Sequence, residues 1–207
     1  MVALFELRGS MDKTLFPALI GALAGAIVSS LGWFVVHALS LRREVVARRD
    51  NAAREHVERQ IEQLYGPLLG LIQHSRMAFA VAQKTLPIND GGQIDFSKFS
   101  DRHGEVWRYF VEDYFVPVNG KIRELIRSKM HLLEAGVLPK SFGEFLVHEV
   151  QLEALHRLWK EHGVDSSGII SGPGWPADFE RETQAVLDEL RVRHQHFLRH
   201  LGVSSAE

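Results

Sequence analysis

The chain has 207 residues, of which 24 are Lys or Arg and 26 are Asp or Glu, so its net charge is −2 at pH 7. This balance lacks the positive excess that proteins use to bind phosphates, so nucleic acid is not an expected partner. Cysteine is absent, which excludes disulfides, a thiolate nucleophile, thiolate zinc sites and cysteine-held iron–sulfur clusters. The length is sufficient for one well-packed domain.

Residues 15–41 form the longest apolar run, with 27 positions that include no Asp, Glu, Lys or Arg. As a helix this run extends about 40 Å, which exceeds the hydrocarbon core of a bilayer at about 30 Å. A cleaved signal peptide is the alternative, but its apolar core is usually about 7 to 15 residues and its positive charge comes first. Here Arg42 and Arg43 follow the run. The sequence therefore predicts a transmembrane helix over 15–41, preceded by a short extracytoplasmic tail at 1–14.

The orientation of the predicted span follows from the basic residues that flank it. Two precede it, Arg8 and Lys13, whereas six follow within 20 residues: Arg42, Arg43, Arg48, Arg49, Arg54 and Arg59. Basic residues are retained on the cytoplasmic side of a membrane and contact anionic headgroups there. We therefore expect the N-terminus outside and the bulk of the chain in the cytoplasm. Met11 is an alternative start that leaves this orientation unchanged.

Small residues line one side of the predicted span. Gly21, Gly25 and Ser29 are spaced four apart, which places them on a single helix face. Small side chains let two helix backbones approach closely in lipid, so this face predicts association with a second copy. The alternative interpretation is ordinary membrane-helix composition, in which Gly is frequent.

The remainder of the chain is predicted to be helical. Residues 42–56 are polar and predict a charged helical stalk, and 57–202 carry apolar residues at steps of three and four, followed by a tail at 203–207. Four amphipathic segments are predicted, over 57–82, 100–134, 141–162 and 176–201. The fold class is therefore all-α: one N-terminal transmembrane helix and a cytoplasmic bundle of about four helices.

Three local signals refine these segments. Pro67 and Pro117 lie inside apolar stripes that continue past them, so each predicts a kink rather than the end of a helix. Ser141 and Glu144 have the spacing of a capping box, which predicts a helix N-terminus at Ser141.

The 11 histidines require metal sites to be considered. Glu153 and His156 have the Glu-x-x-His spacing of di-iron bundles, but such a site needs a second copy of the motif, which the sequence lacks. His196 and His200 are four apart and could chelate zinc, although polar residues in a last helical turn also suit the helix dipole. We predict no metal, no cofactor and no catalytic residue.

One helix face of the third segment carries Glu149, Glu153, His156 and Lys160. We interpret it as a solvated face, and the alternative is a pocket of mixed charge. Because of that alternative, Glu149, Glu153 and His156 are polar positions to test.

Five short stretches occur in an order that resembles a group of uncharacterised bacterial proteins with one N-terminal span and a helical cytoplasmic domain. The stretches are Leu64–Leu68, Phe115–Asn119, Lys129–Leu133, Phe145–His148 and Trp175–Phe179. The resemblance implies a bacterial inner (plasma) membrane and a shared helical fold, and no activity. It adds Asn119, His131 and His148 to the polar positions to test. The alternative role of these three is to satisfy backbone groups at kinks and helix ends.

The sequence thus predicts a membrane-tethered cytoplasmic helical module whose role is protein interaction or self-assembly. Its expected partners are membrane lipid and either a second copy or another protein. The alternatives are an enzyme that acts at the membrane surface through an unidentified polar pocket, and an oligomeric effector that disrupts membranes.

Overall fold

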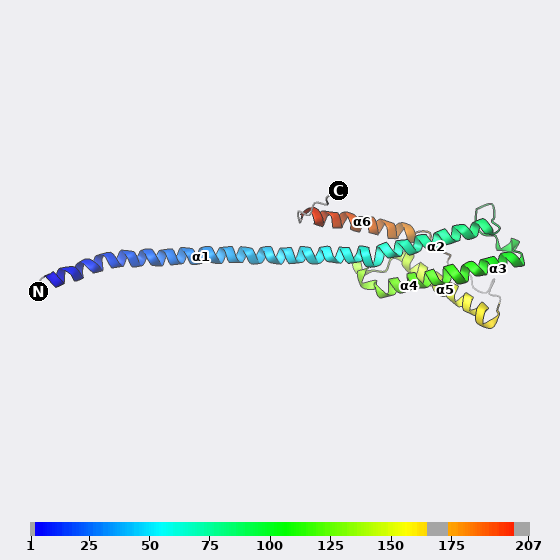
Figure 1. Cartoon of the computed structure of the whole chain (residues 1–207), viewed down its shortest axis with the longest axis horizontal. Helices are drawn as coiled ribbons and strands as arrows, with labels where there is room; N and C mark the ends of the chain where they lie inside the picture. The colour runs from blue at the N-terminus through cyan, green and yellow to red at the C-terminus, as the bar shows by residue number, and fades with distance from the viewer. Residues whose placement is uncertain (1–2, 165–173, 201–207) are drawn as a thin grey trace. The chain divides into compact units, whose positions relative to one another are not determined.

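The computed structural model describes residues 3–164 and 174–200, and it is helical throughout apart from turns, loops and one isolated bridge between Ile88 and Ile94. The predicted all-α fold class is confirmed (Figure 1). Residues 165–173, between the third and fourth predicted helical segments, and the whole of the predicted tail at 203–207 lie outside the described residues. The chain divides into two compact units, residues 1–53 and 54–207, and each is described by itself.

The first unit consists of helix α1, which spans Ala3–Gln60 and whose last residues belong to the second unit. The predicted span and stalk therefore lie in one continuous helix. Side chains are described at Ile20, Leu23, Gly25 and Ser30 and then from residue 32 onward. Within the part of the chain whose side chains are described, no helix contains a stretch long and apolar enough to cross a membrane. The side chain of Ser29 and the surroundings of Gly21 lie outside that part.

The second unit contains five further α-helices and the short turns that join them (Figure 1). In chain order they are the π-helical turn η1 (Ile61–Tyr65), α2 (Gly66–Thr85), the 3₁₀ turn η2 (Phe96–Lys98), α3 (Asp101–Phe110), the π-helical turn η3 (Val111–Phe115), α4 (Val116–Ser128), the 3₁₀ turns η4 (Met130–Leu132) and η5 (Glu134–Gly136), α5 (Lys140–His162) and α6 (Phe179–His200). These helices correspond to the four amphipathic segments expected from the sequence.

A π-helical turn precedes each of the two prolines at which the sequence predicts a kink, Pro67 and Pro117. The N–H of Gly66 donates to the carbonyl of Ile61, and that of Val116 donates to the carbonyl of Val111, so each bond spans five residues. Proline has no N–H and its ring clashes with the carbonyl one turn back, and the wider turn accommodates both effects. The helix therefore continues through Pro67 and through Pro117. At Gly66 a Cβ atom would lie 2.7 Å from the carbonyl oxygen of Ile61, which is why glycine suits this position.

The capping box predicted at Ser141 is wrong. Helix α5 begins one residue earlier, after Pro139, whose extended backbone (ψ 150°) ends the preceding segment. Ser141 consequently lies inside the first turn, is 2% exposed, and donates its hydroxyl to Glu182 of α6 at 2.5 Å. The capping box found in this unit is at the start of α3, where Ser100 and His103 cap each other's backbone N–H groups.

Two hydrophobic clusters form the core of the second unit. The larger, here the proximal cluster, joins α2, α4, α5 and α6 and includes Leu68, Ile72, Ile122, Ile126, Phe145, Phe179, Leu187 and Leu190. The smaller, here the distal cluster, includes Ala78, Ala82, Leu86, Ile94, Phe110 and Phe115, with Trp107 and Leu152 packed against it. Within the proximal cluster the rings of Phe145 and Phe179 stack with their centroids 4.8 Å apart. Helices α2 and α4 are antiparallel. Along α2 the proximal residue Ile72 precedes the distal residue Ala78, whereas along η3 and α4 the distal residue Phe115 precedes the proximal residue Ile122.

Candidate functional site

Three buried polar side chains lie between the two hydrophobic clusters, one on each of α2, α4 and α5. They are Ser75, Asn119 and Glu149, which are 5%, 2% and 3% exposed. About one turn from each polar residue, in one direction, lies a residue of the proximal cluster: Ile72, Ile122 and Phe145 respectively. About one turn away in the other direction lies a residue that belongs to the distal cluster or packs on it: Ala78, Phe115 and Leu152 respectively. The three polar residues therefore lie at one level of the bundle. We call them the polar layer.

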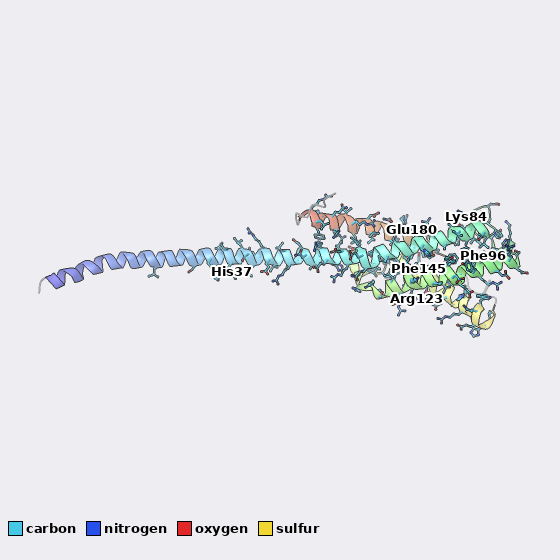
Figure 2. All side chains as sticks on the ribbon, in the orientation of Figure 1. His37, Lys84, Phe96, Arg123, Phe145 and Glu180 are labelled. Carbon is cyan, nitrogen blue, oxygen red and sulfur yellow. The ribbon has the colours of Figure 1, made fainter. Side chains whose placement is uncertain are left out.

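Arg123 of α4 connects the polar layer to the surface of α5. It follows Asn119 by one helical turn, and its Nη1 donates to Glu149 Oε1 at 2.6 Å and also to Glu153 Oε2. The other oxygen of Glu153 accepts from Arg157 at 2.6 Å. Arg123 on α4 and Phe145 on α5 mark this part of the bundle in Figure 2. One buried and one half-buried carboxylate thus share a single guanidinium.

A second group of polar contacts joins η3 to the next turns of α5. Glu112 in η3 lies 3.2 Å from His156 Nε2 and 3.1 Å from Lys160 Nζ, measured at its Oε1. Beside them, the guanidinium of Arg108 lies over the ring of Trp159 at 5.4 Å from its centroid. The C-terminal half of α5 is therefore attached to α3, η3 and α4 largely by polar contacts.

The electrostatics differ between the carboxylates of this site. Burial raises the pKa of Glu149, although the nearby Arg123 opposes the change. Hydrogen bonding from Arg123 lowers the pKa of Glu153, with a further contribution from Arg157. The pKa of Glu112 is lowered, chiefly by its hydrogen bond with Lys160 and then by that with His156. The protein environment therefore disfavours the ionised form of Glu149 and favours the ionised forms of Glu153 and Glu112.

Opposite pKa shifts predict opposite pH dependence for two isosteric variants. A group with a lowered pKa stabilises the fold above its unfolded pKa and loses that contribution as pH falls through its folded pKa. A group with a raised pKa stabilises the fold below its unfolded pKa and loses that contribution as pH rises through its folded pKa. Between about pH 3 and pH 7, and relative to wild type, we expect Glu153→Gln to lose stability as pH rises up to about 4.5, and Glu149→Gln to gain stability as pH rises above about 4.5. Melting temperatures of the three proteins across this range test the prediction, and equal slopes for the two variants would contradict it.

The polar positions chosen from the sequence fall into two groups. Asn119, Glu149 and Glu153 lie within the polar layer and its Arg123 contacts, and His156 lies beside it against Glu112. The interpretation of the α5 face as solvated is wrong for Glu149, because that side chain packs against α4.

The two other histidines lie elsewhere. His131 is exposed in the turn η4. His148 is half-buried, and its ring lies edge-on to Trp175 at 5.9 Å.

Three participants were not selected from the sequence: Ser75, Arg123 and Glu112. Ser75 had a visible signal, since it is a hydroxyl within the apolar stripe of α2. Arg123 and Glu112 gave no comparable signal, because charged residues on amphipathic helices usually face solvent. Among the described side chains, no group of three or more His, Asp or Glu residues is arranged to hold a metal ion.

Comparisons with known proteins add no assignment to this geometry. No protein-family model, no curated protein and no solved structure matches the chain.

Proposed function

We propose that the chain is a single-pass protein of the bacterial inner membrane, with its N-terminus outside and its helical bundle in the cytoplasm. In this proposal the bundle is an interaction module that binds a protein partner or a second copy of the chain. Residues 15–41 form the anchor and 42–56 the charged stalk that leads to the bundle.

The observation that carries the membrane anchor is an apolar surface that surrounds α1. Trp33, Phe34, Val35 and Val36 are consecutive and between 54% and 67% exposed. Consecutive residues of a helix are separated by about 100°, so these four cover its whole circumference. A helix that is apolar on every side has no face suited to water and belongs in lipid or in a protein interior. The charge-free run and the arginines that follow it support lipid.

Reporter fusions test the anchor and its orientation. In a bacterial host, green fluorescent protein fused to the C-terminus should fluoresce in the membrane fraction, whereas alkaline phosphatase at the same position should be inactive. The reason is the six basic residues that follow the run against two that precede it. Replacing Arg42, Arg43, Arg48 and Arg49 with Asn is the matched control and should weaken the orientation. An active phosphatase fusion, or a wild-type chain in the soluble fraction, contradicts the proposal.

The environment of the polar site supports interaction rather than catalysis as the role of the bundle. Asn119 and Glu149 are enclosed by apolar layers, whereas a catalytic group must reach a substrate. The carboxylates nearer the surface are already paired with Arg123, Arg157 and Lys160. Exposed apolar side chains occur instead on the outer faces of two helices: Met77 and Val81 on α2, and Val147 and Val150 on α5. These faces are suited to protein contact.

Self-association through the anchor is the second part of the proposal. Gly25 has open space around the position of a Cβ atom, so a larger side chain strains nothing within one chain. Leu is a strong helix former, so replacing Gly21 and Gly25 with Leu should leave the helix intact while it holds two backbones apart. In an energy-transfer assay in membranes, we expect the double variant to associate less than wild type at equal expression. Ser30→Leu is the control, since Ser30 is about 140° from Gly25 around the helix. Equal signals from wild type and the double variant would place any self-association in the bundle.

A further inference from the structure

Three buried atoms at the polar layer have hydrogen-bonding capacity that the described protein groups leave unused. They are the oxygens Asn119 Oδ1 and Glu149 Oε2 and the nitrogen Arg123 Nε. Asn119 and Glu149 are more than nine-tenths buried, and Arg123 contacts Glu149 directly. Asn119 and Arg123 are one turn apart on one face of α4, and Arg123 bonds Glu149 of α5, so the three residues meet where α4 packs on α5. Leaving a buried polar atom unpaired is costly, and three such atoms on residues in mutual contact or one turn apart require a common explanation.

We propose that the polar layer binds one buried water molecule, which donates hydrogen bonds to Asn119 Oδ1 and Glu149 Oε2 and accepts one from Arg123 Nε. Buried waters in proteins typically make about three hydrogen bonds, and this arrangement supplies three. The hydroxyl of Ser75 lies at the same level of the bundle, on the third helix of the layer.

The chemistry of the three atoms selects a neutral ligand over an ion. A cation has no lone pair for the N–H of Arg123 and is repelled by the guanidinium charge. A halide or a fully deprotonated anion has no hydrogen to donate to the oxygen atoms of Asn119 and Glu149, and the carboxylate repels any anion. Water has two donors and two acceptors, so it matches two acceptor atoms and one donor atom together.

A crystal structure of the full chain, grown in detergent with bromide as the salt, tests the ligand directly. We expect a spherical density peak about 2.7–3.2 Å from all three atoms, with no anomalous signal from bromine. A bromine signal at the site would identify an anion and overturn the proposal. Oxygen contacts of about 2.3–2.6 Å would identify a cation such as calcium and would also overturn it. The absence of any peak between the three atoms would show that the layer is dry.

Melting temperatures provide a second test that needs no crystal. Asn119→Leu removes one of the two acceptors that hold the proposed water, so Glu149 and Arg123 lose a shared partner. We expect the melting temperature to fall by about 2–10 °C. If a bridging water couples the two residues, Asn119→Leu combined with Glu149→Leu should lower it by less than the sum of the single changes. Asn119→Leu combined with Arg157→Met is the control and should be additive. A rise in melting temperature for Asn119→Leu would overturn the proposal.

Discussion

Replacing Arg123 with Met should lower the free energy of unfolding by about 3–5 kcal/mol, the largest effect that we expect from a polar substitution in this chain. Arg123 is the counter-ion of Glu149, which is 3% exposed. Methionine preserves much of the volume of the side chain but leaves the Glu149 carboxylate buried without a positive partner. Urea denaturation of the full chain, followed by circular dichroism, measures the change.

The same cluster offers a matched control. Arg157 also pairs with Glu153, but its side chain is 65% exposed, so Arg157→Met should change stability by no more than about 0.5 kcal/mol. Adding Glu149→Gln to the Arg123 variant removes the unpaired charge and should restore part of the loss. Similar effects of the Arg123 and Arg157 changes, or no rescue by Gln, would show that Glu149 does not depend on Arg123.

Phe145→Ala should lower the free energy of unfolding by a comparable amount, about 3–5 kcal/mol. Phe145 is fully buried, and its ring contacts both Phe179 and Trp175 at centroid distances of 4.8 and 5.4 Å. Alanine removes the ring from the centre of the proximal cluster, and surrounding aromatic groups of this size fill such a cavity only in part. The measurement is the same denaturation experiment.

Helix α5 itself provides the control for this change. Val147 and Val150 lie two and five residues after Phe145 on the same helix and are 55% and 60% exposed. Changing either one to Ala keeps the helix propensity favourable and should alter stability by about 0.5 kcal/mol or less. If Val147→Ala were as damaging as Phe145→Ala, the assignment of the buried face of α5 would be wrong.

The all-helical fold was predictable because it depends on local periodicity. Steps of three and four along 57–82, 100–134, 141–162 and 176–201 placed the helices of the bundle. Details that depend on neighbouring elements were not predictable. The turns before Pro67 and Pro117 are π-helical, with one extra residue in the turn. The spacing of apolar residues does not indicate whether a helix passes a proline through a π-helical turn or through a kink. Ser141 matched a capping motif, yet its hydroxyl is used by α6.

The polar site was predictable only in part. Spacing alone placed Glu149, Glu153 and His156 on one face of α5. Their partners Arg123 and Glu112 depend on how α4 and η3 pack against that face, which is a tertiary property. The burial of Glu149 followed from the same packing, so a solvated face was the natural interpretation of the sequence.

The polar layer also restricts how the bundle can be assembled. The three helices bring Ser75, Asn119 and Glu149 to one level, with apolar residues above and below. If α4 slid along α2 or α5 by one turn, Asn119 would face an apolar layer and the ionised Glu149 would face hydrocarbon in place of Arg123. Each misaligned arrangement would leave polar groups unpaired in the interior, whereas a core of apolar residues alone would accept the slip at little cost. The layer thus acts as an alignment mark, which gives α2, α4 and α5 one preferred register among several that hydrophobic packing would allow.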